Sequence, residues 1–276
     1  MELEALPYTL LIILTEFSVG SLIAVLIADA RGMVVQSFVK LSAVFVVIGA
    51  GLALLAAFGV SGSEFGGYQV REDLYTPIRV TLAIYLAMTL PYLALVYRGQ
   101  RELSLWYGVI TTMAAVLGLV LIAYQISAPT WGFAGVLLSL FAAALALGFV
   151  NESMVLGHWY LVSPKLPGKP LQELTFLLLL TVVLQIGLTA LNASIPARIP
   201  PDTSAALAGS LGSNPAFWLR VGVGLVFPLA LAYMAWQSAK EHAMMSATGL
   251  LYIAVGAVFV GELLARGILF VTGAPV

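Results

Sequence analysis

Eight apolar runs, each long enough to cross a lipid bilayer, constrain this chain more than any other feature of its sequence. An α-helix needs about 20 apolar residues to cross a hydrocarbon core of about 30 Å. The runs stay apolar throughout, whereas strands of a membrane β-barrel alternate apolar and polar residues over about ten positions. The pattern therefore predicts an all-α membrane protein, a single transmembrane domain over residues 1–276 that is a bundle of eight transmembrane helices. We expect these helices at about 6–28, 35–60, 77–98, 103–127, 131–162, 170–193, 215–238 and 244–271.

The composition leads to the same class of protein. Apolar residues make up 61% of the chain and charged residues 9%. Soluble domains are about 45–50% apolar and about 25% charged, so this is the composition of an integral membrane protein. The polar stretches between the runs are too short for a separate soluble domain. A formal net charge of −1, with no basic cluster, gives no reason to expect nucleic acid as a partner.

The residues that could bind a redox centre are few. The chain contains no cysteine and two histidines, His158 and His242, which lie on different predicted segments. Without thiolates it cannot hold an iron–sulfur cluster or a thiolate-bound metal by itself. A haem held by two histidines would need both, so we expect no haem, iron–sulfur cluster or other metal site. The acidic start, with Glu2 and Glu4 where a secretory signal is basic, predicts that the first helix is retained.

Lys and Arg residues are shared unevenly between the two sides of the predicted bundle. The loops after helices one, three, five and seven hold or border Arg31, Lys40, Arg98, Arg101, Lys165, Lys169 and Lys240. The other side has Arg71, Arg79 and Arg198. Because basic residues favour the cytoplasmic side, we expect a multi-pass protein of a prokaryotic inner membrane with both termini on the non-cytoplasmic side. The two longer loops, 61–76 and 194–214, share that side and form a candidate docking face.

One group of charged residues lies at membrane depth toward the predicted outer half. Its members are Glu16, Arg79, Arg220, Glu262 and Arg266. Such residues face protein, a cavity or a ligand rather than lipid. Glu262 and Arg266 are four residues apart on one helix face and can pair, either as a structural ion pair or as part of a site. Glu16 opens a polar notch in an apolar helix, and a buried carboxylate needs a partner or a proton, which favours a function.

A second polar group lies toward the predicted inner half, in the long run that ends near residue 162. Asn151 and His158 are seven residues apart and share a helix face, whereas Glu152 is rotated by about 100° from Asn151 and need not touch His158. His158 is either an interfacial residue beside Trp159 and Tyr160 or a proton carrier or quinone donor, because imidazole titrates near physiological pH. Our hypothesis is that Asn151, Glu152 and His158 form a proton path, while His242 is a solvated loop residue.

Three segments carry a resemblance to a known family. Residues 7–20, PYTLLIILTEFSVG, resemble the first helix of the membrane anchors of complex iron–sulfur molybdoenzymes. These anchors include those of dimethyl sulfoxide reductase, polysulfide reductase and nitrite reductase (NrfD-type). Residues 218–229, WLRVGVGLVFPL, are similar to the family's Arg-Gly-Pro segment near the end of the chain, and residues 256–273 resemble the closing helix. Residues 156–164, LGHWYLVSP, match no hallmark of the family and are a departure from it.

The resemblance implies a quinone-interacting membrane anchor subunit of a multisubunit respiratory oxidoreductase. Such an anchor exchanges electrons between menaquinone or ubiquinone and a docked iron–sulfur subunit, and a separate catalytic subunit, usually a molybdenum enzyme, completes the complex in the lipid membrane. The chain alone is then not the enzyme. We expect Glu16, Glu152 and His158 to be the catalytic, proton-handling residues. We expect quinone to contact Glu16, Arg220, Glu262 and Arg266.

Two other functions stay open. One is a small-solute or ion transporter with Glu16, Glu152 and His158 along its path. The two halves of the sequence are not visibly alike, however, and many transporters are built from repeats. The other is a purely structural anchor of a respiratory assembly, in which the buried charges form ion pairs only.

Overall fold

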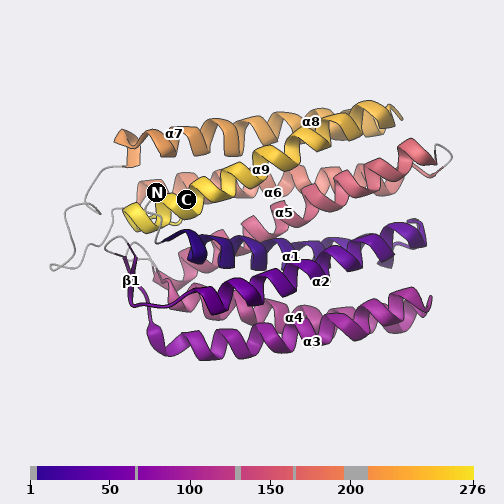
Figure 1. Ribbon diagram of the computed structural model, residues 1–276. Helices are drawn as coiled ribbons and strands as arrows, with labels where there is room; N and C mark the ends of the chain where they lie inside the picture. Colours follow the sequence, from indigo (N-terminus) through magenta and orange to yellow (C-terminus); the bar gives the residue numbers. More distant parts are fainter. Residues whose placement is uncertain (1–4, 66–67, 128–131, 164–165, 196–210) are drawn as a thin grey trace.

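Long helices make up almost all of the part of the chain that the structure describes (Figure 1). This computed structural model describes residues 5–65, 68–127, 132–163, 166–195 and 211–276. Eight spans in these residues are long and apolar enough to cross a membrane, which confirms the expected all-α bundle. The helices are α1 (Leu6–Ala30), α2 (Gln36–Gly59), α3 (Tyr75–Tyr97), α4 (Arg101–Gln125), α5 (Gly132–Val162), α6 (Lys169–Ser194), α7 (Pro215–Val221), α8 (Phe227–Lys240) and α9 (Met244–Thr272).

The helix boundaries lie within a few residues of the expected ones, and the seventh span shows the main difference. That span consists of α7, a π-helical turn η5 (Gly222–Val226) and α8 rather than one continuous helix. The break lies directly before Pro228, which has no backbone N–H and so cannot complete the ladder of an α-helix. Proline also begins α7, because Pro215 occupies its first turn and Asn214 caps it by accepting a hydrogen bond from the Ala216 N–H at 3.0 Å.

The eight spans form two four-helix bundles. Helices α1 to α4 pack in a ring, and the spans α5, α6, α7–α8 and α9 pack in a second ring in the same order. In Figure 1 the first bundle, indigo to magenta, lies below the second. Helix α1 of the first bundle and α5 of the second lie at the boundary between them. Because each bundle has an even number of spans, α1 and α5 begin at the same end and run parallel. The packing order therefore repeats between two halves whose sequences show no visible likeness.

The two bundles meet where α1 crosses α5. A Cβ atom added to Gly20 would lie 1.7 Å from the Ala144 carbonyl oxygen, and one added to Gly148 would lie 2.0 Å from the Gly20 carbonyl carbon. The two backbones are therefore in direct contact, an approach that only glycine allows at these positions. Any larger side chain here must push the bundles apart.

The first and last described residues lie at the same end of the molecule (Figure 1), which we call the terminal end. This end also holds the hairpin of β1 (Glu64–Phe65) and β2 (Tyr68–Gln69), which is followed by the 3₁₀ turn η2 (Glu72–Leu74). A second 3₁₀ turn, η4 (Leu211–Ser213), precedes α7. The Tyr68 hydroxyl donates to the Ile126 carbonyl at 2.9 Å, and the Phe270 ring packs edge-on against Tyr68 and Tyr8.

Two basic residues of the sidedness prediction, Lys165 and Arg198, lie outside the described residues. Arg79, expected among the membrane-depth charges, holds the end of α2 instead. It donates to the carbonyl of Ala57 at 2.9 Å and to that of Val60 at 2.7 Å. These carbonyls end α2 without an intrahelical donor, so Arg79 satisfies them. The side of the membrane on which each end lies stays a prediction.

We predict that Gly20→Leu and Gly148→Val each destabilise the fold by about 3 kcal/mol or more, because the new side chain meets backbone that cannot rotate away. Equilibrium unfolding in detergent micelles measures the change. The matched control is Gly51→Ala, whose added methyl group meets no atom within 4 Å. If Gly148→Val were as stable as Gly51→Ala, the described crossing of α1 and α5 would be wrong.

Candidate functional site

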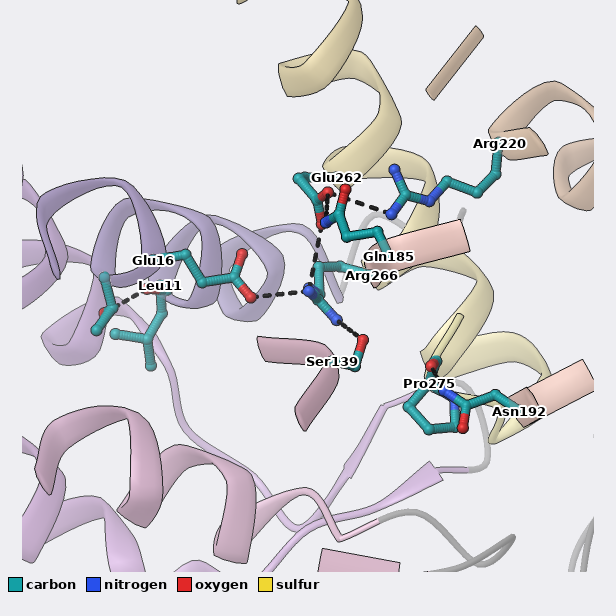
Figure 2. Close-up of polar contacts among 10 residues, drawn as sticks. Leu11, Glu16, Ser139, Gln185, Asn192, Arg220, Glu262, Arg266 and Pro275 are labelled. Carbon is teal, nitrogen blue, oxygen red and sulfur yellow. Dashed lines mark hydrogen bonds and ion pairs between the residues drawn. The ribbon is translucent and has the colours of Figure 1, made fainter. Parts of the chain in front are cut away.

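Four charged side chains meet inside the second bundle and at its contact with α1 (Figure 2). Arg266 Nη2 lies 2.8 Å from Glu16 Oε1 and 3.3 Å from Glu262 Oε2. Arg220 Nη2 lies 3.2 Å from Glu262 Oε1. At most 2% of each of these side chains is exposed. We call these residues, Glu16, Arg220, Glu262 and Arg266, the Glu16 cluster; its formal charges, two negative and two positive, cancel.

The structure thus brings together all four residues that the sequence suggested as one site. The pairing of Glu262 with Arg266 along one face of α9 is confirmed. The longer connections, from α1 to α9 and from α7 to α9, join segments far apart in the chain. Arg266 is the residue shared by two carboxylates, one from each bundle, so it also links the bundles.

Two neutral side chains that the sequence analysis did not select complete the cluster. Gln185 of α6 donates from Nε2 to Glu262 Oε1 at 2.7 Å, and Arg266 Nη1 lies 3.5 Å from Ser139 Oγ of α5. Both neutral side chains are buried. An amide in the middle of the apolar run of α6 is a sequence signal that could have identified Gln185. Serine is common in membrane helices, so nothing in the sequence distinguishes Ser139.

The irregular seventh span places the Arg220 guanidinium group. Pro228 cannot donate to the Gly224 carbonyl four residues earlier, and Arg220 Nη1 donates to that carbonyl instead, at 3.2 Å. Gly224 and Gly261 let η5 touch α9, since a Cβ on Gly261 would lie 2.5 Å from the Gly224 Cα. The same added Cβ would lie 2.7 Å from Arg220 Nη1, so the glycine also leaves room for the guanidinium group. Single π-helical turns are frequent at functional sites.

Some hydrogen-bonding capacity of the Glu16 cluster is left over. Among the described residues, Glu16 Oε2 and the Nε atoms of Arg220 and Arg266 have no hydrogen-bond partner. A cavity of about 10 Å³ borders the cluster, enough for about one water molecule. It is lined by Ser139, Ala142, Gln185, Leu188, Thr189, Arg220, Pro275 and Val276. An unpaired buried carboxylate oxygen is costly, so Glu16 is the member best suited to accept a proton or a donor.

A larger groove of about 420 Å³ follows α9 from Val260 to Val271. Its remaining lining residues are Asn214, Ala216, Leu263, Leu264, Gly267 and Ile268. At 100° per residue, Glu262 and Arg266 lie on roughly the opposite side of α9 from this groove. The groove is therefore apolar except for Asn214, and α9 separates it from the Glu16 cluster.

The structure does not bring the second polar group, Asn151, Glu152 and His158, together at one place. Asn151 Nδ2 donates to Glu152 Oε1 at 2.9 Å, and the Ser42 hydroxyl of α2 donates to Glu152 Oε2. His158 is exposed, and its Nδ1 lies 3.0 Å from the Tyr252 hydroxyl of α9. The structure therefore brings Asn151 and Glu152 together and places His158 on the surface, against Tyr252. The proton path through these three residues stays a prediction.

Comparison of this chain with models of protein families, with curated proteins and with solved structures found no match.

We predict that Glu262→Gln destabilises the protein by about 3–5 kcal/mol, because two buried arginines would then share one carboxylate. Adding Arg220→Met to this variant restores neutrality and should recover much of the loss. Equilibrium unfolding of both single variants and the double variant measures the coupling. The control is Glu173→Gln, whose carboxylate lies 3.6 Å from the exposed Arg31 and should change stability by less than about 1 kcal/mol. A double variant no more stable than Glu262→Gln would contradict charge balance as the source of the effect.

Proposed function

We propose that this chain is the quinone-interacting membrane anchor of a multisubunit oxidoreductase. One observation carries the proposal. The three segments whose sequences resemble such anchors, 7–20, 218–229 and 256–273, are the segments that converge on the Glu16 cluster. Segments so far apart in the chain meet at four buried charges, and buried charges in membrane helices mark functional sites by default.

The chemistry of the chain suits this role. Reduction of a quinone takes up two electrons and two protons, and the apolar interior with its buried carboxylates offers a place for the protons. The sequence has no cysteine, so the electrons would come from an iron–sulfur cluster held by a docked subunit. We propose the terminal end, with its hairpin, as the docking face; residues 196–210 of the second expected loop lie outside the described residues. A separate catalytic subunit, of the molybdenum type that the resemblance implies, would complete the complex.

The conformation of the described residues does not fit a quinone directly against the Glu16 cluster, because the cavity there holds about one water molecule. The groove along α9 has a volume within the range of small-molecule sites, about 300–1,000 Å³. We therefore propose the groove as the quinone site. None of the four expected quinone contacts, Glu16, Arg220, Glu262 and Arg266, lines this groove, so these residues act on it only through α9.

A second function is favoured by a different observation. The Glu16 cluster is neutral, fully buried and largely paired within itself, as expected for a purely structural anchor. In a protein of this kind the charges hold α1, α7 and α9 together and take no part in turnover. The transporter alternative predicts that the chain purifies alone, because a transporter is stable without a soluble partner.

We predict that gentle detergent purification from the native membrane yields this chain with an iron–sulfur protein and bound menaquinone or ubiquinone. Mass spectrometry of the copurifying proteins and extracted quinones is the measurement. A chain that purifies alone and without quinone would contradict the proposal and favour the transporter.

In that complex, we predict that Glu16→Gln abolishes most quinone-linked turnover but leaves turnover with a soluble dye at the partner subunit. The amide keeps the size of the side chain but cannot bind and release a proton. Glu173→Gln is the matched control and should retain both activities, because its carboxylate pairs at the surface with Arg31. Unchanged quinone turnover in a folded Glu16→Gln complex would favour the structural anchor.

A further inference from the structure

Glu152 is a fully buried carboxylate that makes no ion pair with any described residue. Glu16 and Glu262 differ from Glu152 in this respect, since each of those carboxylates contacts an arginine. A charge in the membrane interior without an opposite charge costs several kcal/mol. No described arginine or lysine pairs with Glu152. The site is therefore neutral only when a bound proton or another cation from outside the protein cancels the charge of this carboxylate.

The neighbours of Glu152 are neutral hydrogen-bond donors from three helices. The Ser42 hydroxyl donates to one carboxylate oxygen and Asn151 Nδ2 to the other. Asn151 Nδ2 also lies 3.4 Å from the Ser21 hydroxyl of α1. These groups orient the carboxyl group but add no charge. The Asn151 N–H offers no lone pair to a metal cation, so these contacts leave the carboxylate and two serine hydroxyls as oxygen ligands. Calcium and magnesium ions take about six or more oxygen ligands, so the arrangement favours a proton as the balancing ion.

The contact between α1 and α5 separates Glu152 from the Glu16 cluster. Glu16 lies four residues before Gly20, and Glu152 lies four residues after Gly148, on parallel helices whose backbones touch at these glycines. At 1.5 Å per residue, the two carboxylates are about 12 Å apart along the helix axes, with the crossing between them. Backbone fills the α1–α5 interface at that level, so Glu16 lies on the terminal-end side of the contact and Glu152 on the other side.

Two charged residues, Asp29 and Arg101, lie between Glu152 and the end opposite the terminal end. Asp29, near the end of α1, is about 8 Å further along the axis than Glu152. Its Oδ1 accepts a hydrogen bond from Arg101 Nε at 3.0 Å, and 43% of the Arg101 side chain is exposed. The Asp29–Arg101 pair thus places charged groups between Glu152 and this surface.

Other titratable groups lie on the helices around this part of α5. Those that pair elsewhere are Lys40 of α2 over the Tyr97 ring, Tyr85 of α3 with Ser18, Glu173 of α6 with Arg31, and His158 of α5 with Tyr252 of α9. None of them forms an ion pair with Glu152 in the described ranges.

We propose that Glu152 is a proton-binding site, loaded from the end opposite the terminal end on the side of Asp29, and separated from the Glu16 cluster by the Gly20–Gly148 contact. The site goes beyond the proposed function, since its geometry involves neither quinone nor a partner subunit.

Infrared difference spectroscopy of the full chain in vesicles tests the site. A pH titration of the wild-type protein should show the C=O stretch of a protonated carboxyl group, which disappears on alkaline titration. Glu152→Gln should lose this band, whereas Glu173→Gln and His158→Ala should keep it. Glu152→Asp retains a carboxyl group and should shift the band, which keeps the test decisive if the glutamine variant does not fold. A titrating band that is unchanged in Glu152→Gln would overturn the proposal.

The route and the ion are tested in the same preparation. Asp29→Asn should keep the band but slow its hydrogen–deuterium exchange, while Glu16→Gln should leave the exchange rate unchanged. Equal exchange rates in Asp29→Asn and wild type would overturn the route. Replacing choline by sodium ions should not move the titration. A shift to lower pH in sodium would instead assign the site to a monovalent metal cation and overturn the proton assignment.

Discussion

The arrangement of the membrane domain depends on two ion pairs of Arg266, one with Glu16 and one with Glu262. In a low-dielectric interior every charge must have a partner at short range, so the cluster allows α1, α7 and α9 few relative positions. The Gly20–Gly148 contact sets how closely the two bundles approach, and Arg266 spans the same boundary. Close backbone packing and charge balance therefore reinforce each other at one interface.

Irregular helix geometry serves the same charge balance. An unbroken helix through Pro228 would leave the Gly224 carbonyl without a donor. The π-helical turn and the Gly224–Gly261 contact bring Arg220 to that carbonyl and, at the same time, to Glu262. The break in the seventh span is thus tied to a specific ionic contact, and the glycines on both sides of it have a defined steric purpose.

Two kinds of buried carboxylate coexist in this membrane domain. The carboxylates of the Glu16 cluster are balanced by arginines within a neutral group, which makes them suited to hold helices or to respond to a ligand near α9. Glu152 is held only by neutral donors, so its balance depends on an ion from outside the protein. The crossing of α1 and α5 lies between them, which allows the two sites to communicate with different ends of the bundle.

The amino-acid sequence by itself determined the eight spans, because a continuous apolar run of this length has few alternatives to a membrane helix. It also determined the Glu262–Arg266 pair, since a spacing of four residues follows from the periodicity of one helix. Only the tertiary structure decided that Glu16 meets Arg266, that Gln185 joins Glu262, and that Glu152 faces Ser42 while His158 faces Tyr252. These contacts depend on how each helix is rotated against its neighbours, and that rotation follows from packing at glycines remote in sequence.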